Sequence, residues 1–142
     1  TTALDVTVQS AILQLLDRLR RDRGLALLLI THDPAVAARV TDRVAVMYAG
    51  RIVEDGETKA VLSRAAHPYT VGLLRSIPDP ESPGTRLASI PGTVPSIGHW
   101  PSGCRFHPRC ERANRKCAER YPPTLEGPST RAACWLLEET QR

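Results

Sequence analysis

The chain has 142 residues, of which 42% are hydrophobic and 4% aromatic, so it can build one sizeable core and a small appended module. Nineteen Lys and Arg against fifteen Asp and Glu give a formal net charge of +4, which is too small to indicate nucleic-acid binding by itself. The sequence has no signal peptide, and no apolar run approaches the roughly 20 residues of a membrane span. We therefore expect a protein that is soluble, or at most peripheral to a membrane.

Residues 6–23 have the pattern of an amphipathic helix, because their apolar side chains recur at helical spacing with Gln, Asp and Arg between them. Asp5 suits the N-cap of this helix, and Gly24 suits its C-terminal cap. The residues before the helix already resemble the middle of a domain and include no initiating Met. We therefore expect Thr1 to be a cut end.

Residues 25–31 are an aliphatic run that predicts a strand buried on both faces of a parallel sheet. Ligands of such sheets bind at the carboxyl ends of the strands, which is where His32 stands. Asp33 and Pro34 can then cap and open a short helix over residues 34–39. Taken alone, His32 is more simply explained as an ordinary surface histidine, so the neighbouring segments must decide its role.

A second apolar run, residues 44–48, predicts another strand, and residues 51–56 return from a Gly-containing turn with an alternating pattern that is typical of a β-hairpin. Two more helices are expected over residues 57–65 and 67–74. This order of elements predicts an α/β fold, part of a doubly wound layer. In it, parallel strands are flanked by helices and the hairpin lies at an antiparallel edge.

Proline becomes frequent after Ile77. Because proline lacks a backbone donor and fixes φ, long regular elements are unfavourable there. We therefore expect three parts, an α/β portion over residues 1–77, a Pro-rich linker over 78–97 and a small irregular four-cysteine module over 98–142.

All four cysteines lie in that last module, separated by five, six and sixteen residues; they are Cys104, Cys110, Cys117 and Cys134. Thiols gathered in a segment too short to build its own core indicate that cross-links replace the core. Two disulfides would need an oxidising compartment, which nothing in the sequence signals. A zinc site is chemically sensible but lacks the usual C-x2-C pairs, whereas an iron-sulfur cluster tolerates wider spacing. Spacing alone leaves zinc and the cluster equally open, and His99 and His107 are more simply surface histidines than ligands.

Several short motifs lie within and between these elements. They are Thr2-Ala3-Leu4-Asp5, Ile30-Thr31-His32-Asp33, residues 42–56 across the hairpin, His67-Pro68-Tyr69-Thr70, Ile90-Pro91-Gly92-Thr93-Val94-Pro95, and residues 103–110 with the first two cysteines. The first three resemble the C-terminal part of an ABC-transporter ATPase. The last three resemble one branch of that superfamily, the oligopeptide/dipeptide importer ATPases. The resemblance covers essentially the whole chain.

The resemblance implies a role for each matching position. His32 resembles the switch histidine that contacts the γ-phosphate of ATP and holds the attacking water in place, a positioning task in phosphoryl transfer. Asp5 resembles the D-loop aspartate, which reaches across the nucleotide sandwich to the partner subunit. Members of this branch carry a 4Fe-4S cluster on the four cysteines. The resemblance therefore makes the cluster the expected cofactor, with zinc as the alternative.

The resemblance also implies partners and a location. The full subunit would use ATP and Mg2+ and pair with a second ABC ATPase subunit, either identical or related. It would drive transmembrane permease subunits and, indirectly, serve an extracytoplasmic peptide-binding protein; no nucleic acid is expected. Its place would be the cytoplasmic face of the plasma membrane, as a peripheral protein.

The sequence departs from the family where phosphate is bound. No G-x-x-x-x-G-K-[ST] occurs in it, and the family's Gln-loop, signature motif and Walker B strand are missing. We therefore expect this chain alone neither to bind ATP tightly nor to hydrolyse it. The alternative function is a stand-alone four-cysteine metal-binding interaction module with no ATPase role.

Overall fold

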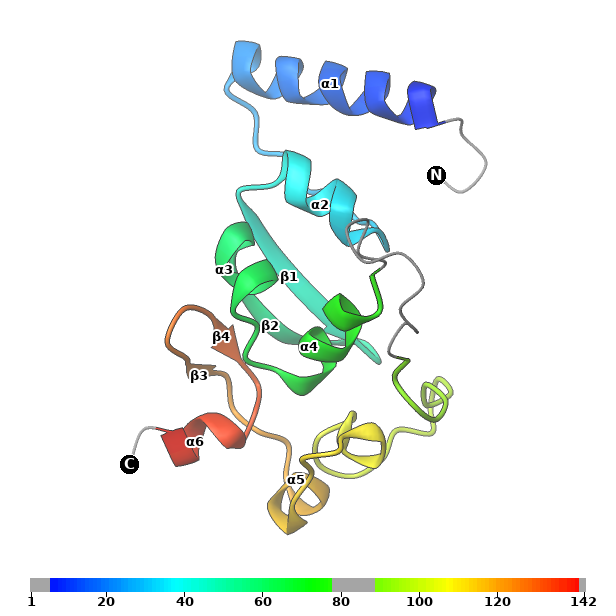
Figure 1. The fold of residues 1–142 in the computed structure, drawn as a ribbon, viewed down its shortest axis with the longest axis vertical. Coiled ribbons are helices and arrows are strands. Elements are labelled where there is room, and N and C mark those ends of the chain that lie inside the picture. The colour runs from blue at the N-terminus through cyan, green and yellow to red at the C-terminus, as the bar shows by residue number, and fades with distance from the viewer. Residues whose placement is uncertain (1–5, 78–88, 141–142) are drawn as a thin grey trace. The chain divides into compact units, whose positions relative to one another are not determined.

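The computed structural model of the chain describes residues 6–77 and 89–140 (Figure 1). The chain divides into two compact units, Thr1–Thr41 and Asp42–Arg142. The first unit contains two helices, and the second contains the sheet and all four cysteines.

The first helix, α1 (Val6–Arg23), has the predicted bounds. It ends where Gly24 adopts a left-handed φ of +61° and the backbone N–H of Leu25 donates to the carbonyl of Arg20 at 3.0 Å. A glycine in this conformation satisfies a carbonyl that the helix would otherwise leave without a partner. The predicted C-terminal cap at Gly24 is therefore confirmed, whereas the predicted N-cap, Asp5, lies outside the described residues.

The second helix, α2 (Pro34–Val40), confirms the short helix predicted after the aliphatic run. The Asp33 carboxylate accepts hydrogen bonds from the backbone N–H groups of Ala35 and Val36, at 2.8 and 3.4 Å. Proline follows at the first helical position, where its missing N–H costs nothing.

Residues 25–31 form no strand, so the predicted parallel strand is wrong for this structure. A strand needs a neighbour to complete its hydrogen-bond ladder, and burial on both faces needs a layer above and a layer below. No described strand pairs with this segment, and Leu28 and Ile30 are 87% and 89% exposed. The pairing among the described strands is antiparallel throughout.

The predicted hairpin is confirmed as β1 (Arg43–Tyr48) and β2 (Arg51–Glu57), which pair antiparallel. Its two turn residues, Ala49 and Gly50, have φ values of +47° and +78°. Positive φ at both central residues is what a type I′ turn requires, and this turn matches the twist of the flanking strands.

The sheet continues beyond the hairpin with two short strands from the cysteine module, β3 (Leu125–Glu126) and β4 (Arg131–Ala132). Strand β4 pairs with β2 on one side and with β3 on the other, which gives the order β1-β2-β4-β3. The cysteine module is thus joined to the hairpin by backbone hydrogen bonds, which sequence patterns did not indicate.

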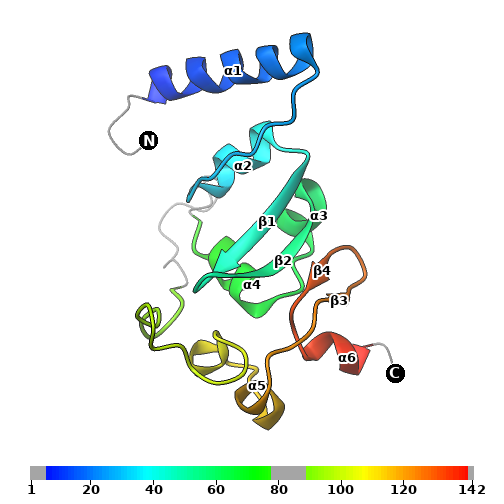
Figure 2. The ribbon, with the colours of Figure 1, turned by 180° about the vertical axis from the view of Figure 1, so that it is seen from behind.

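Two helices cover one face of the hairpin, α3 (Thr58–Ser63) and α4 (Pro68–Arg75). They lie in front of β1 and β2 in Figure 1, and behind the strands in the reversed view of Figure 2. Both were predicted; the prediction for α3 began one residue earlier and ended two residues later, and the prediction for α4 is displaced by one residue towards the N-terminus. The remaining elements are short: η1 (His107–Arg109), α5 (Arg115–Glu119) and α6 (Leu136–Thr140). In the described ranges no helix combines the length and apolar character that crossing a membrane demands.

An aromatic core connects the hairpin to the cysteine module. Tyr48, from the end of β1, packs edge-on against Phe106, with ring centroids 5.2 Å apart, and Tyr69 of α4 lies 5.5 Å from the same ring. Such edge-to-face pairs add to the free energy gained from burying the rings. A second core cluster contains Cys134, so one thiol is itself part of the packing.

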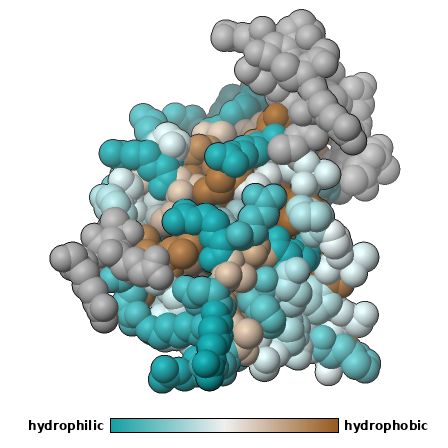
Figure 3. Space-filling view, turned by 60° about the horizontal axis from the view of Figure 1, so that its bottom comes forward, coloured by the Kyte–Doolittle hydropathy of each residue, from teal (hydrophilic) through white to brown (hydrophobic). Residues whose placement is uncertain are grey.

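Viewed with the C-terminal part brought forward, the surface shows hydrophobic residues in patches between hydrophilic ones (Figure 3).

Candidate functional site: a pocket lined by four cysteines

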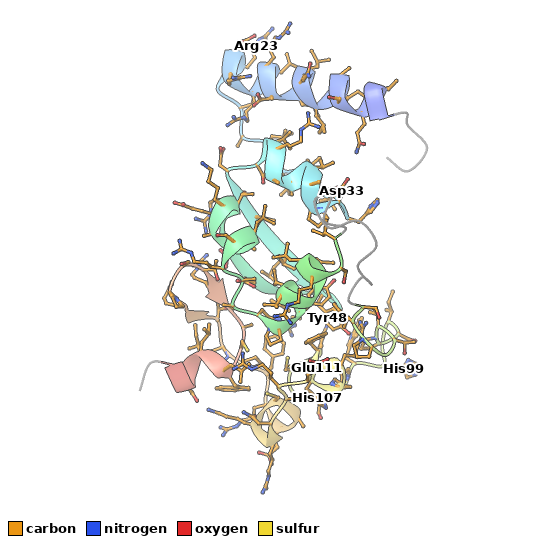
Figure 4. All side chains as sticks on the ribbon, viewed as in Figure 1. Arg23, Asp33, Tyr48, His99, His107 and Glu111 are labelled. Carbon is orange, nitrogen blue, oxygen red and sulfur yellow. The ribbon has the colours of Figure 1, made fainter. Side chains whose placement is uncertain are left out.

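Of the two residues predicted for the nucleotide site, the structure describes only His32. His32 is exposed on a bend just before α2, and Asp5 lies outside the described residues. The bend is held by the backbone N–H of Asp33, which donates to Thr31 Oγ1 at 3.0 Å. Figure 4 labels Asp33 at the start of α2.

The four cysteines, in contrast, line a single pocket of the second unit, which also touches two imidazoles; the residues are Cys104, Cys110, Cys117, Cys134, His67 and His107. All four thiols are free, so neither of the two possible disulfides is formed. No carboxylate of the described residues lines the pocket. Sulfur is therefore the main atom type that the pocket offers as a ligand to a bound metal or cofactor.

Short local structures place each thiol. The backbone N–H of Cys104 donates to the carbonyl of Cys117 at 2.8 Å, which ties the first and third cysteines together. Cys110 ends η1, and Cys117 lies in the first turn of α5, where its N–H donates to the Asn114 side chain at 3.1 Å. Cys134 lies two residues after the end of β4. The sheet and two short helical turns thus converge on one point.

Burial favours the protonated form of three of these thiols. It raises the pKa of Cys134 to about 11, and it also raises the pKa of Cys104 and of Cys110. The neighbouring cysteines contribute in the same direction to Cys134, because each additional thiolate would repel the next. Thiolates would therefore form here together with a bound positive charge, as metal binding requires.

The arrangement does not resemble a closed site for one metal ion. Over the described residues, no group of three or more His, Cys, Asp or Glu side chains is placed to hold a metal ion. Tetrahedral zinc, with Zn–S bonds near 2.3 Å, would need sulfur atoms only about 3.8 Å apart. The pocket thus gathers four thiols without showing the arrangement that a bound metal ion requires.

Apolar and cationic groups surround the pocket. Phe106 and Trp135 are 3% and 8% exposed, and both line it. The indole N–H of Trp135 donates to the carbonyl of Arg120 at 3.0 Å, and the Lys116 ammonium lies 3.8 Å from the centre of the Trp135 ring. Lys116 also pairs with Glu138. Cys117 and Cys134 are buried, whereas Cys104 and Cys110 are partly exposed, and positive charge lies near the pocket.

Sequence reasoning assigned no role to two buried polar residues of the site, although His67 was noted in the motif His67-Pro68-Tyr69-Thr70. Glu54 in β2 is 1% exposed, and its carboxylate accepts hydrogen bonds from the N–H of Ala66, the N–H of His67 and the hydroxyl of Thr130, at 2.7, 3.0 and 2.6 Å. His67, also 1% exposed, has its pKa lowered to about 4 by burial. For Glu54, the only available signal was that a charged residue occupies an inward position of a predicted strand.

Comparisons with known proteins identify the relatives of this chain. Residues 53–117 match the family model described as "Oligopeptide/dipeptide transporter, C-terminal region". The chain is 43% identical to the oligopeptide transport ATP-binding protein OppD of Salmonella typhimurium over 135 residues, which are 95% of this chain and 40% of that relative. It is 42% identical to OppD of Haemophilus influenzae over 139 residues, 98% of this chain and 43% of that relative.

Over most of its length the chain is thus similar to transport ATP-binding proteins, and the family model that it matches describes a C-terminal region. The family that these matches indicate is that of the oligopeptide/dipeptide transporters, to whose C-terminal region residues 53–117 are similar. The chain spans 40% to 43% of the length of the relatives named above. The relatives lend no support to the alternative of a stand-alone interaction module.

Proposed function

We propose that the chain is the C-terminal portion of the ATP-hydrolysing subunit of an oligopeptide or dipeptide ABC importer, which powers uptake across a membrane. The match of residues 53–117 to a region specific to these transporters carries the proposal. That region contains β2, α4 and three of the four pocket cysteines, Cys104, Cys110 and Cys117. The chain alone lacks a phosphate-binding loop, so the activity belongs to the full-length subunit.

In that subunit, residues 25–31 would form a buried strand of a P-loop ATPase domain. The exposure of Leu28 and Ile30 supports this proposal, because an apolar segment gains free energy when further strands and helices cover it. His32 would then stand at the carboxyl end of a strand, where α/β domains bind their ligands.

His32 would act there on the γ-phosphate of ATP, and Asp5 would reach the partner ATPase subunit. The full subunit would use ATP and Mg2+, pair with an identical or related ATPase subunit, and dock on permease subunits at the cytoplasmic face of the membrane. An extracytoplasmic peptide-binding protein would deliver the cargo. The exposed position of His32 beside the Asp33 cap leaves its imidazole accessible for such a contact.

The substitution His32→Ala in the full-length subunit is expected to lower ATP turnover by about 100-fold or more, because misplaced reacting groups cost rates of that order. Nucleotide binding should remain largely intact, since other loops of the domain hold the phosphates. Steady-state hydrolysis and nucleotide affinity measure the two effects. His99→Ala, at another exposed histidine, is the matched control. Unchanged hydrolysis in His32→Ala would refute the assigned role.

We propose further that the four-cysteine pocket holds a 4Fe-4S cluster in the native subunit. The donor set fits, because four free thiols line one pocket without a carboxylate, and four Cys thiolates are the usual ligands of such a cluster. When bound, such a group supplies one-electron chemistry or a structural cross-link. Cys104, Cys110, Cys117 and Cys134 would hold it, while the buried rings of Phe106 and Trp135 line the same pocket.

Purification of the full-length subunit without oxygen is expected to give a brown protein with broad visible absorbance and about four iron and four sulfide ions per chain. Cys117→Ser should lose most of this absorbance, because Cys117 is buried and its thiol cannot be replaced from solvent. Iron, zinc and acid-labile sulfide analyses provide the measurement. Zinc without iron in the anaerobic protein would overturn the cluster in favour of a single-metal site.

A further inference from the structure

The imidazole of His67 has one nitrogen whose role is fixed and one whose role is not. His67 precedes α4, and its Nδ1 accepts a hydrogen bond from the backbone N–H of Tyr69 at 3.1 Å. An N–H can only donate, so Nδ1 carries a lone pair and no proton. The neutral ring therefore carries its proton on Nε2.

This second N–H has no hydrogen-bond partner among the described residues. The residue as a whole is 1% exposed, but Thr70 Oγ1 is the only buried side-chain N or O atom without a hydrogen-bond partner among the described residues, so Nε2 of His67 is not fully buried. Nε2 therefore borders open space, and His67 lines the pocket of the four cysteines. An N–H that borders a pocket is available as a hydrogen-bond donor to a group bound there.

The pocket of the four cysteines is where an acceptor for this N–H would lie. His67 lines the pocket together with all four thiols, and no described carboxylate lines it. The backbone of His67 is anchored by its N–H, which donates to the Glu54 carboxylate at 3.0 Å, and the ring is oriented by the hydrogen bond to Tyr69 and lies 5.8 Å from the Phe106 ring. The donor is thus held beside sulfur atoms by the same residues that tie β2 to the module.

We propose that His67 is a positioning residue that donates its Nε2–H to a sulfur atom of the group bound in the pocket. The inference rests on the proposed cluster. A hydrogen bond to cluster sulfur stabilises the more negative, reduced form, so His67 raises the reduction potential and orients the group in the pocket. The neighbouring His107 differs, because its Nδ1 lies 2.9 Å from the Cys104 carbonyl and must donate to it.

Two substitutions separate the cap from the donor. His67→Asn places an amide oxygen near the position of Nδ1, so it keeps the cap of α4 and loses the N–H directed at the pocket. His67→Gln reaches farther and restores an N–H near the position of Nε2. His99→Asn, at an exposed histidine outside the pocket, controls for the loss of an imidazole.

The test uses the full-length subunit, reconstituted anaerobically with ferrous iron and sulfide, and measures iron content and midpoint potential by a titration followed by electron paramagnetic resonance. The expected result is full loading in each protein, a more negative potential in His67→Asn, and partial recovery in His67→Gln. With 15N-labelled histidine, weak coupling of one ring nitrogen to the reduced cluster should vanish in His67→Asn.

Three outcomes overturn the proposal, and they are distinguishable. An unchanged potential in fully loaded His67→Asn shows that no such hydrogen bond exists. Loss of iron binding in both His67 variants, with a loaded parent, assigns the residue a purely structural role. Failure of the unsubstituted subunit to take up iron and sulfide overturns the cluster itself, and the inference with it.

Discussion

Replacing Gly103 by alanine is expected to destabilise the second unit by about 3–5 kcal/mol. Gly103 has a φ of +64°, and a Cβ added to it would lie 2.3 Å from the carbonyl oxygen of Cys117 and 2.8 Å from the carbonyl carbon of Ala118. Both are backbone atoms, which cannot move aside as the end of a flexible side chain can. The Cys117 carbonyl also accepts the N–H of Cys104, so the clash falls on the link between two pocket thiols.

Gly98→Ala is the matched control for this substitution. Gly98 also has a positive φ, +83°, but an added Cβ would meet nothing within 4 Å. It should therefore cost only the left-handed strain of an alanine, about 1–2 kcal/mol. Urea unfolding followed by Trp fluorescence compares the two, since both tryptophans, Trp100 and Trp135, belong to the second unit. Equal costs at the two glycines would contradict the proposed close backbone approach.

Elements with local causes were predictable from the sequence. The first helix has its own apolar period and a glycine to end it, and the hairpin has a turn whose two residues accept positive φ. The strand expected over residues 25–31 failed because a buried strand is defined by its neighbours, and the described residues supply none. An apolar run specifies burial, whereas pairing depends on distant residues.

The candidate site also has a part that was predictable from the sequence and a part that was not. Four cysteines in one short module predicted a common site, and the structure gathers them in one pocket. Their supporting residues could not be predicted, because Glu54 meets Thr130 across 76 positions of sequence and His67 acquires its environment only when the module folds over the hairpin. Strand β4 was missed for a related reason, since a two-residue strand carries no periodicity.

Replacing Glu54 by alanine is expected to cost about 3–5 kcal/mol of the free energy of unfolding. The carboxylate accepts three hydrogen bonds at distances of 2.6–3.0 Å while 1% exposed, so its removal leaves three donors without their acceptor. Glu54→Gln should cost less, because the amide oxygen can still accept, although its NH2 group would face a donor. We therefore expect Glu54→Ala to be the least stable protein, Glu54→Gln to be intermediate and the unsubstituted protein to be the most stable.

Glu57→Ala provides the control, because Glu57 ends the same strand, is exposed and makes no side-chain cap bond to α3. Its cost should stay within about 0.5 kcal/mol, as for most surface positions. Urea unfolding of all three variants gives the comparison. Since Glu54 also holds the backbone of His67, Glu54→Ala should reduce iron loading of the reconstituted full-length subunit. If stability fell but loading stayed complete, the carboxylate would brace the fold without supporting the pocket, and His67 would need another anchor.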